Sequence, residues 1–188
     1  MNEEESTKKK IEIDIREMTI DDIAAVFHLG EKVFTAQKLP TLYRTWDEFE
    51  VVTHFSGDPD LCLVAEYNET IIGFALATIV QKSRAVWKYG YLTWIAVHPF
   101  FHRIRIADRL FRRMVDLLNE QGAHFIIVDT EADNTEALKF FRKNGFGNPK
   151  EHVYLSLNIK QFYQRKRHRP KEKEQKKTLP VEEGHAGD

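Results

Sequence analysis

Several arginines gather where an apolar segment gives way to a charged one. They are Arg103, Arg105, Arg109, Arg112 and Arg113. Residues 91–97 before them are apolar or β-prone, and Pro99 ends this predicted strand because it has no N–H to donate. A strand that runs directly into a helix leaves backbone N–H groups pointing out of the turn, with the positive end of the helix dipole behind them. The guanidinium group of arginine can donate two parallel hydrogen bonds to a phosphate, so the pattern predicts an anion site. Any single one of these arginines could equally belong to a solvated basic helix face.

The composition predicts one globular domain with charged tails. The 188 residues are 42% hydrophobic, which is enough for a proper core. We expect residues 1–10 to be disordered, residues 11–159 to form the domain, and residues 160–188 to be a basic, mobile tail. Residues 160–188 carry a net charge of +4, which leaves −5 on the rest of the chain. An acidic body suits an amine-bearing substrate better than a nucleic acid.

Cys62 is the single cysteine of the sequence and lies in the apolar run LCLVAEY. It reads as a core thiol in a reducing compartment, and one cysteine makes neither a disulfide nor a zinc site. The hydrophilic N-terminus is unlike a signal peptide, and no apolar run approaches the length of a membrane span. We therefore expect a soluble, cytoplasmic protein without a metal.

Hydrophobic periodicity predicts a mixed α/β fold. The strands are expected at residues 11–18, 61–67, 70–80, 91–97, 124–131 and 152–159. The helices are expected after Thr19, within residues 35–55, from residue 105, and at residues 135–143. Asn68 and Glu69 form the turn of an antiparallel hairpin, and the strands flanking the helix from residue 105 form a right-handed parallel crossover. Such a crossover leaves a crevice at the carboxyl ends of its strands, which is a natural ligand site.

The segment from Tyr91 to Leu118 resembles motif A of the GCN5-related N-acetyltransferase family. In that motif a strand ending in V-x-P is followed by [Q/R]-x-x-G-x-[G/A] and a helix. Residues 97–99 match the strand end and Ala107 matches the last loop position. His102 stands where the family usually has Gln or Arg, and Arg105 stands where it usually has Gly. In the family these loop N–H groups hold the pyrophosphate of acetyl-CoA.

The segment after the last apolar strand resembles the family's motif B, N-x-x-A-x-x-F-[Y/F]-x-x-x-G-F. The matching residues are Asn134, Ala137, Phe140, Phe141, Gly145 and Phe146. The resemblance spans residues 11–159, and within the family the sequence is similar to N-terminal and ribosomal-protein acetyltransferases. It implies a single-domain α/β fold with a mixed, mostly antiparallel sheet, one parallel β-α-β crossover and helices on both faces.

The resemblance implies that a primary amine attacks the thioester of acetyl-CoA directly. The amine must first lose a proton, which a carboxylate usually accepts. Asp129 occupies the position where similar N-terminal acetyltransferases carry a carboxylate, so it is the predicted base, with Glu131 in reserve. Many members protonate the leaving thiolate with a Tyr at the position where this chain has Phe141. Tyr154 is predicted to donate that proton instead, and His152 is a weaker option. Ordinary structural roles for these residues are the alternative.

The same resemblance implies where both substrates bind. Backbone groups of Ile95 and Val97 contact the pantetheine arm, and the side chain of Asn134 and the ring of Phe141 line the same site. The pyrophosphate lies on the loop of His102, Arg103, Ile104, Arg105, Ile106 and Ala107. The acceptor wall contains Phe34, Tyr43 and Trp46, although packing onto the core would explain Tyr43 and Trp46 equally well.

The predicted function is an acetyl-CoA-dependent N-acetyltransferase that acts on an amine of a protein or peptide, with a small-molecule amine as an alternative acceptor. Arg105 and Phe141 favour a different class, a weak or inactive module for acyl-CoA sensing or protein interaction. A third hypothesis takes the tail RKRHRPKEKEQKK as a nucleic-acid or ribosome contact. The sequence is compatible with a monomer or a dimer.

Overall fold

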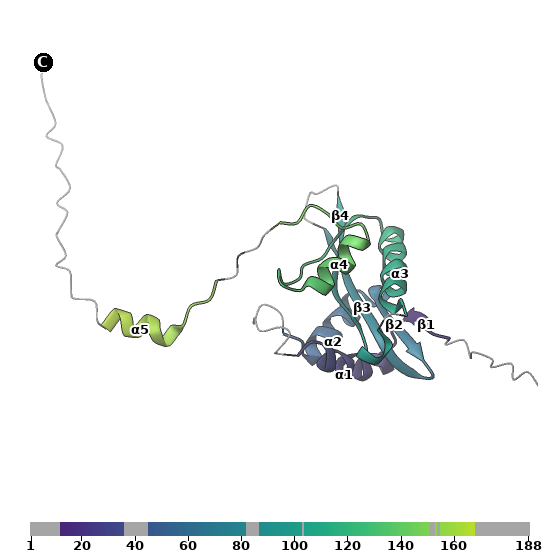
Figure 1. The fold of residues 1–188 in the computed structure, drawn as a ribbon, viewed down its shortest axis with the longest axis horizontal. Coiled ribbons are helices and arrows are strands. Elements are labelled where there is room, and N and C mark those ends of the chain that lie inside the picture. The colour runs from purple at the N-terminus through teal and green to yellow at the C-terminus, as the bar shows by residue number, and fades with distance from the viewer. Residues whose placement is uncertain are drawn as a thin grey trace, which may run out of the picture. The chain divides into compact units, whose positions relative to one another are not determined.

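The computed structural model describes residues 12–35, 45–81, 87–102, 104–150, 153 and 155–167. The chain divides into two compact units, one up to Gly147 and one from Asn148 onward. Figure 1 shows the strands and helices of the first unit, and the helix α5 (Ile159–Arg167) of the second.

The first unit is built on a sheet whose strands follow one another in sequence order. They are β1 (Asp14–Glu17), β2 (Cys62–Tyr67), β3 (Thr70–Gln81), β4 (Lys88–Val97) and β5 (Ala123–Ile127). Neighbouring strands are antiparallel except β4 and β5, which are parallel. The predicted mixed, mostly antiparallel sheet with a parallel crossover is therefore confirmed.

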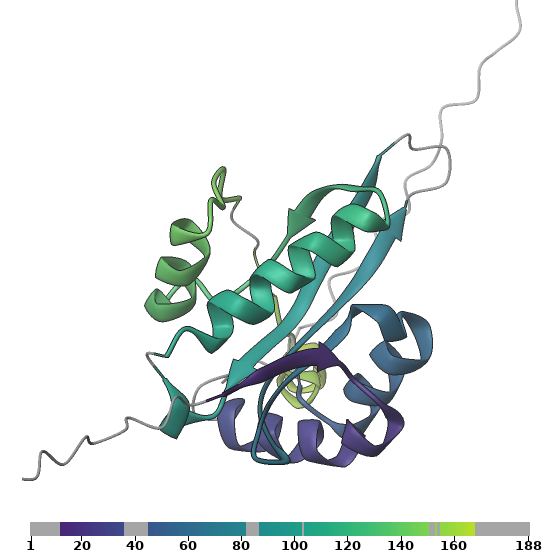
Figure 2. The same cartoon turned by 90° about the vertical axis from the view of Figure 1, so that its right-hand side faces the viewer.

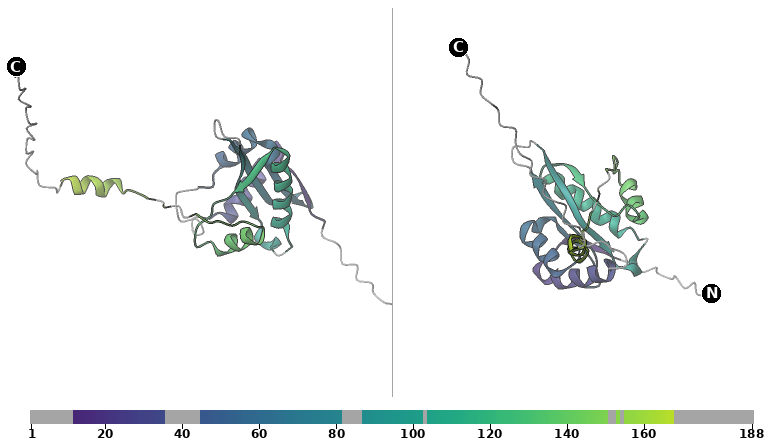
Figure 3. Two further views of the ribbon diagram at one scale, coloured as in Figure 1. Left: turned by 90° about the horizontal axis from the view of Figure 1, so that it is seen from above. Right: turned by 90° about the vertical axis from the view of Figure 1, so that its left-hand side faces the viewer.

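Helices cover both faces of this sheet, as predicted. They are α1 (Ile23–Val33), α2 (Glu48–Gly57), α3 (Ile106–Glu120) and α4 (Thr135–Lys143), with short 3-10 turns η1 (Ile20–Asp22), η2 (Pro59–Leu61) and η3 (Pro99–Phe101). Figure 2 shows α3 lying along one face of the sheet. The right-hand view of Figure 3 shows α3 and α4 on one side of the sheet and α1 and α2 on the other.

Each face of the sheet has its own hydrophobic core. The apolar stripe predicted for α3 is confirmed, since its members are all buried: Ile106, Leu110, Met114, Leu117 and Leu118. These side chains share a cluster with Leu63, Ala75 and Leu92 of the sheet. On the opposite face Val26 of α1 and Val51 of α2 pack with other sheet residues. Cys62 is buried in this second core, and burial raises the pKa of its thiol to about 12, as befits an unreactive core cysteine.

The first strands are connected by the turn that the sequence indicates. Asn68 and Glu69 both have positive φ, 47° and 60°, and they join β2 to β3 as a tight hairpin turn. Near the start of the chain, Arg16 of β1 donates to Asp22 of η1 at 2.6 Å and to Glu66 of β2 at 2.6 Å. The Arg16 guanidinium lowers the pKa of Asp22 to about 2, so this ion-pair network holds three elements together.

The strand β4 departs from the expectation that it is buried on both faces. Leu92, Trp94 and Ala96 are buried, but the residues between them are partly exposed. The reason is that β5 pairs only with Lys88–Tyr91, so the two parallel strands part beyond that point. A register shift in the β3–β4 pairing, from Trp94 to Leu92, also leaves Thr93 as an extra residue. Such bulges are common beside active sites.

Two predictions for the carboxyl-terminal part of the chain are wrong. The strand β5 ends at Ile127 rather than at residue 131, so Asp129 lies in the segment after it. Val153 and residues 155–158 are not in a strand, and the helix α5 begins where a closing strand was expected. Asn158 caps this helix, because its side chain accepts a hydrogen bond from the Gln161 N–H at 3.0 Å. Lys, Arg and Gln are strong helix formers, which explains a helix in a segment without a wide apolar stripe.

Across the part of the chain that the structure describes, no helix combines the length and the apolar character that a bilayer crossing requires.

Candidate active site

The turn between β4 and α3 keeps an unusual backbone conformation at Arg105. This residue, the N-cap of α3, has φ 63° and ψ 25°, the left-handed region that glycine adopts most easily. A residue with a Cβ costs about 1 kcal/mol there. The side chain of His102 ties the turn to the strand, since its Nε2 donates to the Val97 carbonyl at 3.2 Å. The turn therefore has the shape that a glycine would give it, although an arginine occupies the position.

A basic hollow lies beside this turn, between α3 and the end of α4. Its volume is about 330 Å³ and its lining residues are Arg105, Asp108, Arg109, Arg112, Lys143 and Asn144. Lys143 pairs with Asp108 at 2.8 Å and thereby lowers the pKa of that carboxyl. Arg109 donates to the Ile13 carbonyl at 2.7 Å. The lining keeps an excess of positive charge next to a helix N-terminus, so it fits phosphate groups.

A tyrosine and a carboxylate meet where the two parallel strands part. The Tyr91 hydroxyl donates to Asp129 Oδ1 at 2.6 Å, and both residues are partly buried. Tyr91 faces Ile127 in the last register pair of β4 and β5. This hydrogen bond orients the carboxylate just after the end of β5. The arrangement can accept a proton from a group that enters there.

The aromatic residues predicted to form an acceptor wall pack among themselves. The Trp46 ring lies 5.3 Å from Phe34 and 5.1 Å from Trp94 between ring centroids. The Trp46 Nε1 donates to the Phe27 carbonyl at 2.9 Å. Phe34 and Trp46 thus belong to the core beneath α1 and α2, which agrees with the packing alternative; Tyr43 lies outside the described residues.

The residues of motif B have mainly structural roles. Asn134 caps α4, because its Oδ1 accepts from the Ala137 N–H at 3.1 Å, and the helix ends at Lys143, two residues before Gly145, which has φ 92°. Phe141 is only 8% exposed, and its ring centroid lies 5.2 Å from that of Phe146. Little of the Phe141 surface is left for a ligand. A phenylalanine in the core also cannot donate a proton.

The remaining predicted residues lie along β4 and the turn, or beyond the described residues. Ile95 and Val97 are partly exposed and pack toward the α3 core. In the turn, Ile104 is 40% exposed and Ala107 is partly buried, whereas the Ile106 side chain is buried at 1%, so only its backbone could contact a ligand. Arg103, His152 and Tyr154 lie outside the described residues.

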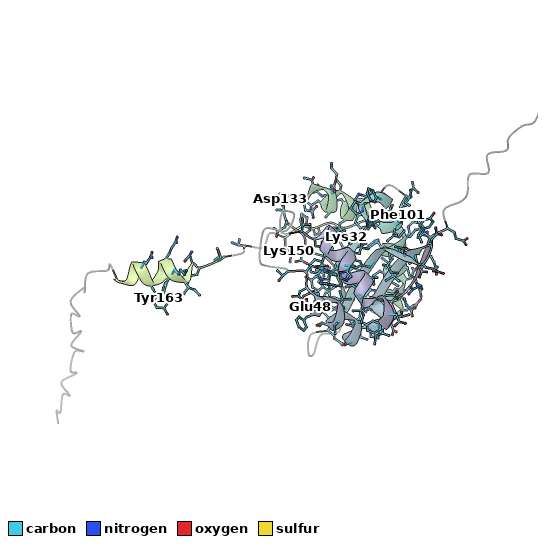
Figure 4. All side chains as sticks on the ribbon, turned by 90° about the horizontal axis from the view of Figure 1, so that it is seen from below. Lys32, Glu48, Phe101, Asp133, Lys150 and Tyr163 are labelled. Carbon is cyan, nitrogen blue, oxygen red and sulfur yellow. The ribbon has the colours of Figure 1, made fainter. Side chains whose placement is uncertain are left out.

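A second hollow lies at the other side of the sheet and does not resemble a reaction site. Its volume is about 530 Å³, and its lining includes Lys32 of α1 and Phe101 of η3, both labelled in Figure 4. Arg16 on its wall is already paired with both Asp22 and Glu66. The basic hollow and the hydrogen-bonded pair of Tyr91 and Asp129 are the better candidates.

Three features of the site do not follow from local sequence patterns. The sequence indicates Tyr91 only as a strand residue, and its contact with Asp129 depends on the register between β4 and β5, which no local pattern encodes. The bulge at Thr93 depends on the pairing of β3 with β4 in the same way. The bridge between Asp108 and Lys143 joins two helices that lie apart in sequence.

Comparison with known proteins identifies related sequences. The family model described as "Acetyltransferase (GNAT) family" matches residues 23–146. N-alpha-acetyltransferase 30 of Schizosaccharomyces pombe is 30% identical over 100 residues, which are 53% of this chain and 66% of that protein. Acetyltransferase ECA0875 of Pectobacterium atrosepticum is 29% identical over 133 residues, 70% of this chain and 85% of that protein. The chain spans only 27% to 66% of the length of the N-alpha-acetyltransferase 30 relatives it matches.

Solved structures share the fold. The NatC complex bound to Gag peptide and CoA contains a chain with a TM-score of 0.63 and 21% identity, over 74% of this chain and 87% of that one. The aminoglycoside N-acetyltransferase AAC(6')-Iy in complex with CoA gives a TM-score of 0.61 and 21% identity, over 78% and 95% of the two chains. At these identities the likeness concerns the fold.

Proposed function

This chain belongs to the acetyltransferase (GNAT) family, and we propose that it transfers the acetyl group of acetyl-CoA to a primary amine of a protein or peptide. The observation that carries the proposal is the hydrogen bond between Tyr91 and Asp129, 2.6 Å long, where β4 and β5 part. It holds a carboxylate just after the carboxyl end of β5, beside the point where the pairing with β4 stops. The relatives named N-alpha-acetyltransferase favour a protein acceptor.

The chain's own residues fit the phosphates of acetyl-CoA. Arg105, Arg109, Arg112 and Lys143 give the hollow beside α3 its positive lining, and the α3 N-terminus adds backbone N–H groups. The left-handed backbone of Arg105 keeps the turn open in the way a glycine would. We therefore assign the phosphates to the hollow and the turn, and keep Ile95 and Val97 as the predicted contacts of the pantetheine arm.

In this proposal Asp129 is the general base. Its carboxylate takes a proton from the substrate ammonium, directly or through water, and the neutral nitrogen then attacks the thioester carbonyl carbon. The carbon–sulfur bond breaks as the amide forms, and the thiolate takes up a proton to give CoA. A thiol has an ordinary pKa near 8.5, so a dedicated acid is not essential, which is compatible with Phe141 in place of a tyrosine. Tyr91 is a positioning residue that orients the Asp129 carboxylate.

The test is the release of CoA from acetyl-CoA in the presence of amines. We expect Asp129→Asn to lower kcat/KM by about 10²- to 10⁴-fold, because the amine loses its base. Calorimetric titration should show unchanged acetyl-CoA affinity, since Asp129 is not in the basic hollow. Glu131→Gln is the matched control and should retain most of the activity.

Equal rates for Asp129→Asn and the parent chain would overturn the assignment of the base. A polyamine or an aminoglycoside that is acetylated with a higher kcat/KM than any peptide would move the acceptor to the small amines. Absence of CoA release with every amine, together with intact acetyl-CoA binding, would support a non-catalytic module instead.

A further inference from the structure

We propose that the helix α5 binds a single strand of nucleic acid, with its aromatic side chains stacking on bases and its cations contacting phosphates. The site lies wholly within the second unit of the chain. Its ligand is a polynucleotide, which is neither of the two substrates of acetyl transfer. The inference therefore does not depend on the proposed function.

The chain carries no negative charge in and around α5. Residues 152–171 contain six Lys or Arg and no Asp or Glu. Four of these six basic residues fall within the helix: Lys160, Arg165, Lys166 and Arg167. Basic residues in the last turn suit the negative end of the helix dipole, but Lys160 lies in the first turn, where the dipole disfavours a cation. Because no acidic residue of the same helix compensates these charges, α5 attracts a polyanion.

Aromatic side chains of the same helix are exposed. Ile159, Phe162 and Tyr163 are spaced three and four residues apart, so they share one face of α5. Phe162 is 39% exposed and Tyr163 is 61% exposed. Their ring centroids lie 5.6 Å apart at an interplanar angle of 80°. Exposed rings and cations on one element are the combination that holds single-stranded nucleic acid, because bases stack on the rings while phosphates contact the cations.

The size and composition of α5 favour a single strand over a duplex or a membrane. The nine residues of the helix span about 14 Å, which is room for about four phosphates at a spacing of about 3.4 Å. In a duplex the base faces are already stacked on one another and are closed to the two rings. The apolar face occupies little more than one helical turn, which is small for a helix that inserts into a bilayer surface.

The first experiment measures the binding of a fluorescein-labelled oligouridine of about 12 nucleotides to the full chain by fluorescence anisotropy. Four cations on phosphates predict that the logarithm of the association constant falls with the logarithm of the salt concentration at a slope of about −3. This slope means a loss of affinity of roughly 50-fold between about 50 and 200 mM salt. Binding that does not change with salt would contradict the proposal.

Two variants with the same change in net charge locate the site. Replacing all four basic residues of α5 by Gln, which is also a strong helix former, should remove most of the binding and of its salt dependence. The matched control replaces Lys171, Lys173, Lys176 and Lys177, which follow the helix in sequence, by Gln. The control should retain most of the affinity. Equal losses in the two variants would mean that binding follows the total charge of the chain, and α5 would not be the site.

Tyr163→Leu tests the stacking, because leucine keeps an apolar side chain in the helix but has no ring. Affinity for the oligouridine should fall about 5- to 100-fold, as expected for the loss of one stacked base. Phe49→Leu is the matched control, since Phe49 is an exposed ring, at 69%, on α2 of the first unit. An unchanged affinity in Tyr163→Leu, or an equal fall in Phe49→Leu, would rule out stacking on α5.

Competing ligands identify the class of partner. Unlabelled oligothymidine should displace the oligouridine, since phosphates and base faces are common to both strands. The matched RNA duplex should displace it less well, and vesicles with about one third phosphatidylserine should not displace it at about 150 mM salt. Stronger displacement by the duplex or by the vesicles than by the single strand would overturn the proposal in favour of a double-stranded or a membrane partner.

Discussion

At the scale of single residues, Arg105 is the strongest departure from the family pattern. Its left-handed backbone, φ 63°, shows that the turn keeps the conformation a glycine would take. Its side chain lines the basic hollow together with Arg112 and Lys143. Arg105 in place of glycine therefore adds a small backbone cost and places a cation at the proposed phosphate site.

Arg105→Gly separates these two contributions. We expect the free energy of unfolding to rise by up to about 1 kcal/mol, because the left-handed strain disappears. Acetyl-CoA affinity should fall about five- to tenfold with the loss of one charged contact. Urea denaturation and calorimetric titration measure the two effects.

Arg105→Ala is the control for that experiment, because it removes the guanidinium but keeps the Cβ. It should lose affinity like the glycine variant without the gain in stability. Tighter acetyl-CoA binding by Arg105→Gly than by the parent would show that the arginine obstructs the turn.

At the scale of elements, the sequence predicts a helix or a turn correctly wherever only one face of the element is buried and the signal comes from neighbouring residues. The stripe of α3 and the hairpin turn at Asn68 and Glu69 were predicted correctly, because helical spacing and turn chemistry are local signals. The end of β5 could not be predicted, since residues 128–131 continue the same pattern and only the departure of β4 ends the pairing. The contact between Tyr91 and Asp129 depends on that register for the same reason.

The contact between α1 and the segment before α2 depends on the absence of one side chain. A Cβ at Gly30 would lie 2.0 Å from Cε2 of Trp46. Gly30→Ala should therefore displace the Trp46 indole and cost about 2–3 kcal/mol of stability, even though alanine is the better helix former. Urea denaturation followed by tryptophan fluorescence would measure this loss.

Gly57 in α2 is the matched position, because a Cβ there meets nothing within 4 Å. Gly57→Ala should be neutral or stabilising by up to about 1 kcal/mol. Equal stabilities of the two alanine variants would mean that Trp46 does not pack on Gly30 in solution.

At the scale of the whole molecule, charge is divided unevenly along the chain. Residues 1–159 carry −5 and residues 160–188 carry +4, so the net charge is only −1. Long-range attraction of a cationic acceptor depends on the sum of these charges, and salt screens it over about 10 Å at 0.1 M. The tail thus weakens the field that the acidic domain would otherwise exert on an amine.

Neutralising the tail should strengthen acceptor capture at low salt. Replacing Lys171, Lys173, Lys176 and Lys177 by Gln changes the net charge from −1 to −5 without touching the domain. At saturating acetyl-CoA, we expect the KM of a lysine-containing acceptor peptide to fall about twofold or more at 20 mM salt and to match the parent above roughly 300 mM, where charges are screened. A peptide of the same length with acidic residues is the control, and its KM should rise under the same conditions. If instead the variant raises the KM of the cationic peptide, the tail takes part in binding the acceptor itself and does not act through net charge.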